Sequence, residues 1–153
     1  MELSLYQKQS LVVLRVALGW LYFYAGYTKL SDPAWSAAGY IKSAKVFPGL
    51  YQMFLNPFVL PIINFLNEWG LTLLGLSLIF GIFVRMSGKL GIILMLLYYF
   101  VLPFPHPDAN SYIVDQHIIY SAVLLVLVTE RAGRMWGCDK WLSRFSWASR
   151  HLS

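Results

Sequence analysis

Charged residues are scarce in this sequence. Asp, Glu, Lys and Arg make up 12% of its 153 residues, whereas they make up roughly 25% of an ordinary soluble domain. Hydrophobic residues make up 58%, and four long stretches carry almost no charge. This composition argues against an ordinary soluble domain and indicates a protein whose solvent is lipid.

Cysteine is nearly absent as well. The single Cys138 has no partner for an internal disulfide, and the sequence has no CxxC motif, so thiol redox chemistry within the chain is not expected. We find no flavin motif, no iron–sulfur cysteine set and no pair of histidines within a hydrophobic stretch that would bind heme. A metal site is not indicated either, because His106 and His117 have no third ligand at a useful spacing.

Four hydrophobic stretches approach the roughly 20 apolar residues that a helix needs to cross a bilayer. Lipid offers the backbone no hydrogen-bond partners, so the stretches must be helices. We predict an all-α, integral membrane four-helix bundle that forms a single domain over residues 1–153. The third span is the weakest, since prolines from Pro103 onward end it early. The predicted spans cover about residues 11–30, 58–84, 87–104 and 112–130.

Lysine and arginine predict the orientation, because cytoplasmic loops retain them. Their uneven distribution places both termini in the cytoplasm of a cell (plasma) membrane protein, and it favours contact with anionic lipid heads over nucleic acid. The basic residues on the predicted inner side are Lys8, Arg85, Lys89, Arg131, Arg134, Lys140, Arg144 and Arg150. Those on the outer side are Lys29, Lys42 and Lys45.

Two segments outside the spans combine aromatic with basic residues. In the connection over residues 31–57, this content predicts one or two short helices at the outer interface, where they would cap a site. After Arg131, the tail has the pattern of an amphipathic segment on the inner surface. The aromatic residues of the connection include Trp35, Tyr40, Phe47, Tyr51 and Phe54.

The first span carries a stripe of polar and small residues. Arg15, Gly19, Tyr22, Gly26 and Lys29 follow one another at intervals of four, three, four and three residues, so they share one helix face. The glycines allow a neighbouring helix to come close. The charges at the two ends, about 21 Å apart, are either functional groups or the snorkelling ends of a packing stripe.

The second span places Asn64, Glu68 and Thr72 on one face, with Asn67 at its flank. Glu68 lies roughly 10–15 Å below the outer surface, where an unpaired carboxylate would be protonated or would require a cation. We interpret Glu68 as a proton carrier or as the partner of Arg15 or Lys29. The alternative is a buried ion pair that serves helix packing alone.

Asp115 and His117 occupy the outer turns of the fourth span. Two positions correspond to about 200° around a helix axis, so we expect at most one of the two side chains to face the bundle interior. Asp115 has a second interpretation as an acid that interacts favourably with the helix N-terminus.

The polar side chains of the spans gather in their outer half. They predict an outward-opening pocket with aromatic walls, suited to a quinone head whose carbonyl oxygens need donors and whose reduction needs protons. An ordinary aromatic belt at the interface would have a similar composition. The predicted catalytic residues are Glu68, Asp115, Arg15 and Lys29. The predicted cofactor-binding residues are Tyr24, Tyr27, Asn64, Tyr98 and His117.

Three motifs resemble the DoxX and DoxD membrane proteins. They are Arg15-x3-Gly19 followed by Ala25-Gly26-Tyr27-Thr28-Lys29-Leu30, then Glu68-x-Gly70-x4-Gly75-x5-Gly81-x3-Arg85, and the ending Gly133-Arg134-Met135-Trp136-Gly137-Cys138-Asp139-Lys140-Trp141. The resemblance implies a four-helix membrane bundle. For the DoxD branch it implies a subunit of thiosulfate:quinone oxidoreductase, which passes electrons from thiosulfate to a membrane quinone while tetrathionate forms.

Two functions of different classes follow. The first is a quinone-linked redox subunit, with electrons carried by a partner or by the bound quinone. The second is a non-catalytic accessory subunit of a larger respiratory or other energy-converting membrane complex. Small size, the missing cofactor motifs and the abundant aromatic residues favour the second. Either function implies contact with lipids and with other membrane subunits or further copies of the chain.

Overall fold

The structure, a computed structural model, describes residues 3–101 and 112–142. All its regular elements are helices, as the sequence predicts. They are α1 (Leu5–Leu30), α2 (Ala38–Lys42), α3 (Pro48–Met53), α4 (Leu60–Phe80), α5 (Val84–Val101), α6 (Gln116–Thr129), the 3-10 helix η1 (Ala132–Arg134) and α7 (Asp139–Leu142).

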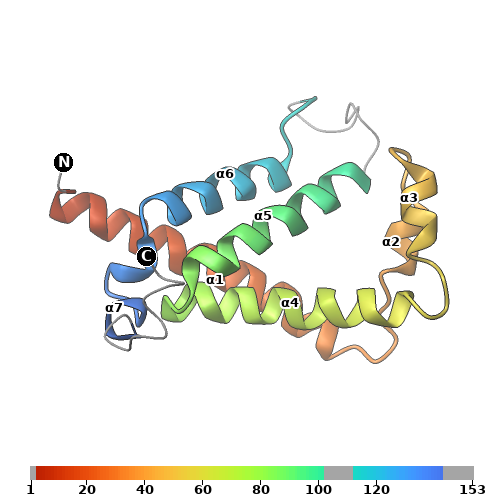
Figure 1. Ribbon diagram of the computed structural model, residues 1–153, viewed down its shortest axis with the longest axis horizontal. Helices are drawn as coiled ribbons and strands as arrows, with labels where there is room; N and C mark the ends of the chain where they lie inside the picture. The colour runs from red at the N-terminus through yellow and green to blue at the C-terminus, as the bar shows by residue number, and fades with distance from the viewer. Residues whose placement is uncertain (1–2, 102–111, 143–153) are drawn as a thin grey trace.

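The long helices form two pairs. Helix α1 packs along α4, and α5 packs along α6, whereas α4 and α5 touch one another much less. The short helices α2 and α3 lie at one end of the molecule, and α7 lies at the other end with the start of α1 and the turn between α4 and α5 (Figure 1). The long helices are therefore covered by α2 and α3 at one end and contacted by the C-terminal segment at the other.

Three described helices, α1, α4 and α5, are long and apolar enough to cross a membrane. Large apolar side chains on their outer faces are exposed, among them Val13 at 69% and Leu73 at 57%. Such extended apolar surface is typical of a membrane interaction rather than of contact with water.

The second and third predicted spans have boundaries that local signals explain. Helix α4 begins at Leu60 with Pro61 in its first turn, and it ends before Gly81, whose φ is +67°. The prediction of residues 58–84 was therefore too long at both ends. At the C-terminal end the reason is Gly81, which adopts the left-handed conformation that stops a helix. Helix α5 then runs from Val84 to Val101, and residues 102–104 of that predicted span lie outside the described residues.

The fourth predicted span is the shortest of the long helices. Residues 112–130 were expected to be helical, but α6 begins at Gln116 because Asp115 is its N-cap with an extended backbone. Its 14 residues reach about 21 Å, less than the roughly 30 Å hydrocarbon core of a bilayer. The weakest span is thus the fourth, and the expectation that it would be the third was wrong.

The predicted segments outside the spans are present where the structure describes them. The connection of residues 31–57 was expected to hold one or two short helices, and it contains two, α2 and α3. The tail contains η1 and α7. Residues 143–153 of the predicted amphipathic tail lie outside the described residues.

The glycine stripe of α1 is the closest helix contact. Arg15, Gly19, Tyr22 and Gly26 are all buried, which confirms that they share one helix face. A Cβ atom added at Gly26 would lie 2.5 Å from the backbone nitrogen of Thr72, and one added at Gly75 would lie 2.3 Å from that of Phe23. The backbones of α1 and α4 therefore approach one another as only glycine allows.

This contact predicts opposite effects for two glycines of α4. Gly75→Ala should lower the free energy of unfolding by about 1–3 kcal/mol, because a methyl group there meets the α1 backbone, which has little room to move. Gly70→Ala should be neutral or stabilising by up to about 1 kcal/mol, since a Cβ at Gly70 meets no atom within 4 Å and alanine favours a helix. Thermal unfolding in detergent, followed by circular dichroism, measures both. Equal effects of the two substitutions would contradict the close contact.

Candidate functional site

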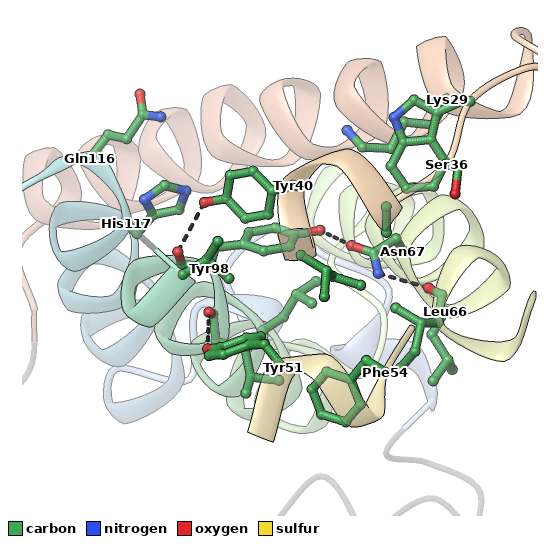
Figure 2. Close-up of a pocket in the computed structure, with 17 residues that line it drawn as sticks. Lys29, Ser36, Tyr40, Tyr51, Phe54, Leu66, Asn67, Tyr98, Gln116 and His117 are labelled. Atoms are coloured by element: carbon green, nitrogen blue, oxygen red, sulfur yellow. Dashed lines mark hydrogen bonds between the residues drawn. The ribbon is translucent and has the colours of Figure 1, made fainter. Parts of the chain in front are cut away.

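A pocket of about 510 Å³ lies beneath the α2–α3 segment, against α4, α5 and the start of α6 (Figure 2). We call it the cap pocket, and the segment over residues 31–57 the cap. Its apolar wall includes Ile41, Phe54 and Leu94, and tyrosine rings complete the wall. The volume is within the usual range for a small-molecule site, and the connection expected to cap a site covers this pocket.

Hydrogen bonds attach the cap to the end of α5. The hydroxyl of Tyr40 donates to the carbonyl oxygen of Tyr98 at 2.9 Å, and that of Tyr51 donates to Leu97 O at 2.7 Å. The amide of Lys45 donates to Val101 O at 3.3 Å. The carbonyls of Tyr98 and Val101 belong to the last turn of α5, which a helix leaves without internal partners, and that of Leu97 directly precedes it. The cap therefore stabilises α5 while it covers the pocket.

Tyr40 is a neutral donor at physiological pH. Partial burial raises its pKa to about 12, and the nearby Asp115 and Tyr51 add to the effect. Its hydroxyl therefore keeps its proton over the whole range in which the protein would operate.

Polar groups lie on two opposite sides of the cap pocket. In Figure 2, His117 and Gln116 lie on one side, and Lys29 and Asn67 on the other. The ring of Tyr98 lies between them, and its hydroxyl donates to Asn67 Oδ1. The middle of the pocket is thus apolar and aromatic, with hydrogen-bonding groups at both sides.

Lys29 remains at the rim of this pocket. Its Nζ donates to Ala25 O at 3.0 Å and lies 5.5 Å from the centre of the Trp35 ring. The ring and the carbonyl oxygen both attract the positive charge, so Lys29 is held in place by α1 and the cap.

Asp115 and His117 form a pair. One carboxylate oxygen of Asp115 accepts from the amides of His117 at 2.9 Å and Ile118 at 3.1 Å. The other lies 2.5 Å from His117 Nδ1. The two side chains meet although two helical positions would separate them by about 200°, because Asp115 precedes the helix and its side chain turns back over the first turn as an N-cap. Of the two, only His117 lines the cap pocket, in agreement with the expectation that at most one faces inward.

The contact between Asp115 and His117 favours the ionised form of Asp115 and determines which ring nitrogen of His117 faces the pocket. Burial raises the pKa of Asp115, but the hydrogen bonds from the His117 ring and from the two amides outweigh it, so the pKa is lowered. The ionised carboxylate accepts the Nδ1 proton of His117, which leaves Nε2 as the nitrogen available to the pocket. His117 lines the pocket, while Asp115 orients it.

Glu68 and Asn64 were predicted to face the site, and the structure places them beside it. Neither lines the cap pocket, which receives Ile63, Leu66 and Asn67 from the same helix. Glu68 is half-buried and forms no ion pair with Arg15 or Lys29 in the described part of the chain. Asn64 instead accepts from Ala37 N at 3.0 Å and donates to Ser36 Oγ at 3.3 Å, so it positions the start of the cap.

Tyr24 and Tyr27 do not contribute to the pocket wall. They are 57% and 54% exposed, and Tyr27 stacks on Phe23 along the outside of α1. Tyr24 lies about 200° around the helix from the buried Tyr22, which explains its outward direction. Their predicted place in the wall is taken by Tyr40, Tyr51 and Tyr98, of which the last was predicted.

Arg15 lies at the other end of the molecule, away from Lys29. It is 2% exposed, and its Nη1 donates to Ala132 O at 2.5 Å and to Met135 O at 3.1 Å. Lys29 is 14 positions further along α1, about 21 Å away, so the two cations cannot hold one small anion.

Three glycines make room for the side chains of Arg15 and Asp139. A Cβ atom added at Gly81 or Gly137 would lie 2.7 or 2.8 Å from Nη1 of Arg15, and one at Gly133 would collide with the carboxylate of Asp139. We call Arg15, these glycines and Asp139 the arginine cradle. Gly81 of the second-helix motif thus meets Gly137 of the C-terminal motif beside Arg15.

Asp139 was not predicted as a functional residue, and it completes the arginine cradle. It is 3% exposed and accepts from the amides of Phe83 at 2.7 Å and Val84 at 3.3 Å, so it caps the start of α5 from a distant part of the chain. Burial raises its pKa, against the opposing effects of these amides and of Arg15. The one signal available in the sequence was an acid within a glycine-rich run.

Comparison with known protein families identifies the family of this chain. The model of the family described as DoxX matches residues 10–103. The chain belongs to the DoxX family. The match confirms the resemblance to DoxX and covers most of α1 and all of α2 to α5. With its long apolar helices, the chain is a DoxX family membrane protein. No curated protein and no solved structure matches the chain significantly.

The cradle predicts a large stability effect at Asp139 of this DoxX protein. Asp139→Ala should lower the free energy of unfolding by about 2–4 kcal/mol, because it leaves two helix-start amides without their acceptor and removes the anion nearest to Arg15. Glu130→Ala is the matched control, since Glu130 is exposed at the same end, and it should change stability by less than about 0.5 kcal/mol. Thermal unfolding in detergent distinguishes them, and a normal Tm for Asp139→Ala would rule out the capping role.

Proposed function

We propose that this DoxX protein is a quinone-linked redox subunit whose cap pocket binds the head of a membrane quinone. The observation that carries the proposal is the arrangement of polar groups on two opposite sides of an aromatic-walled space. A quinone ring carries carbonyl oxygens at opposite edges and is otherwise flat and apolar. His117 and Gln116 would meet one edge, and Lys29 and Asn67 the other.

The Asp115–His117 pair supports proton transfer to that ligand. Reduction of a quinone to a quinol takes up two electrons and two protons. An imidazole held by a carboxylate can deliver a proton from Nε2, and the carboxylate stabilises the charged ring before the transfer. Asp115 and His117 lie where α6 begins, at one end of the bundle (Figure 1), so protons would reach them without crossing it.

The electron donor and partner follow from the family resemblance. In the DoxD branch the electrons come from thiosulfate, when two thiosulfates join through a new sulfur–sulfur bond and release two electrons. We propose a partner subunit for that half of the reaction, since the sequence has no heme, flavin or iron–sulfur motif. Quinone reduction would then be the part assigned to this chain.

This function predicts a strong effect of His117. His117→Ala should lower thiosulfate-dependent quinone reduction in membranes about a hundredfold, as is common when a general acid is removed. Glu68→Gln serves as the matched control, because Glu68 is an ionisable residue of the bundle that does not line the pocket. We expect its rate to stay within about twofold of the parent. A full rate with His117→Ala would exclude His117 from proton delivery.

We also propose that both termini are cytoplasmic and that the cap faces outward across the plasma membrane. The start of α1, the α4–α5 turn and the end of α6 lie at one end of the molecule (Figure 1). That end carries Lys8, Arg85, Lys89 and Arg131, which supports a cytoplasmic location.

The lone cysteine allows a direct test of this orientation. Cys138 is exposed, so a membrane-impermeant maleimide should label it in inverted vesicles and not in intact cells or right-side-out vesicles. A Cys138→Ala variant that also carries Ser31→Cys, at the exposed end of α1, should show the reverse pattern. Labelling of Cys138 from outside would overturn the orientation.

A further inference from the structure

A second space, of about 680 Å³, forms a groove between α4 and α5. It exists because α4 packs on α1 and α5 on α6, so the two helices that face the groove touch one another much less. Its walls are made by apolar side chains such as Leu73, Met86 and Leu90. Gly70 leaves part of the groove open, since a Cβ there meets no atom within 4 Å.

The groove offers its occupant little to hydrogen-bond. The two serines that line it are paired with each other, Ser77 Oγ and Ser87 Oγ lying 2.6 Å apart. Each hydroxyl also lies near a backbone carbonyl, Ser77 Oγ at 2.5 Å from Ile82 O and Ser87 Oγ at 3.0 Å from Phe83 O. One serine therefore donates to the other, which donates to its carbonyl, and both protons are used. A polar ligand would lose its hydration here without compensation, so the groove fits a hydrocarbon chain.

The groove is continuous with the cap pocket. Leu66, Leu94 and Leu97 line both spaces. From Leu66 the groove follows α4 to Phe80, a distance of about 21 Å along the helix. Together the two spaces fit an amphiphile with a flat head and a long apolar tail. A phospholipid head fits the cap pocket poorly, because Lys29 is the one lysine or arginine lining it among the described residues.

We propose that the α4–α5 groove holds the isoprenoid tail of the membrane quinone whose head occupies the cap pocket. This assignment rests on the proposed function and extends it to the tail. The quinone would enter from the bilayer between α4 and α5, with its head beneath the cap and its tail still against lipid. Tail length would then contribute to affinity.

A comparison of two quinones tests the tail site. The full chain in lipid nanodiscs is titrated with a quinone that lacks a tail and with the same head carrying a long isoprenoid tail. Gly70→Phe should weaken binding of the tailed quinone at least about tenfold, because the phenyl ring would fill the open space beside Gly70 and remove the van der Waals contacts of the tail with the groove. Binding of the tail-less quinone should not change. Leu125→Phe, at an exposed position of α6 outside the groove, should leave both affinities unchanged.

The outcomes separate the groove from the proposed function. If Gly70→Phe changes neither affinity, or changes both equally, the tail assignment is overturned. If the unsubstituted chain binds neither quinone, the proposed function fails, and a photoreactive isoprenoid alcohol without a quinone head tests the groove alone. Crosslinks to Leu73, Met86 or Leu90 would still support an isoprenoid site. Crosslinks confined to other faces, or a bound phospholipid that the tailed quinone does not displace, would overturn it.

Discussion

The close approach of the α1 and α4 backbones is the constraint on which the rest of the bundle depends. Gly26 lies against Thr72, and Gly75 against Phe23, at distances that exclude any larger residue without movement of a helix. Because α4 uses this face for α1, its opposite face, with Gly70, is left to border a groove with α5. The same contact brings the end of α1, with Lys29, beside the turn of α4 that carries Asn67. One glycine contact therefore sets both the pocket and the groove.

The two ends of the bundle are stabilised by different kinds of interaction. At one end, the buried Arg15 and Asp139 tie the C-terminal segment to α1 and α5, and breaking either link would leave a charge or helix-end amides without partners. At the other end, neutral tyrosine hydroxyls attach the cap to α5. Each such bond contributes about 1 kcal/mol, so the cap end is the easier one to open. This asymmetry suits a protein whose binding site lies beneath the cap.

The cap pocket combines an apolar interior with one oriented imidazole. Asp115 fixes the ring of His117 through Nδ1 and gives α6 its first cap at the same time, so helix formation and ring orientation depend on one carboxylate. The cap supplies Tyr40 and Tyr51, and α4 supplies Asn67. Residues from four separate helices thus surround one space, which no single helix could enclose. Its continuation into the α4–α5 groove gives an amphiphilic ligand a place for both of its parts.

The sequence by itself determined the helical class, the long apolar helices, the helical cap between the first two of them and the membership of a family, because these depend on hydrophobic runs, prolines and glycine spacing along one chain. It also marked Lys29, Tyr98 and His117, which the structure places at one pocket. Only the tertiary structure decided that Arg15 lies beside Asp139 and the C-terminal glycines. It also decided that Glu68 lies beside the pocket, and that Tyr24 and Tyr27 point away from it. Those outcomes depend on which helix faces pair and on side chains that fold back at helix ends. Neither is encoded by spacing within a single helix.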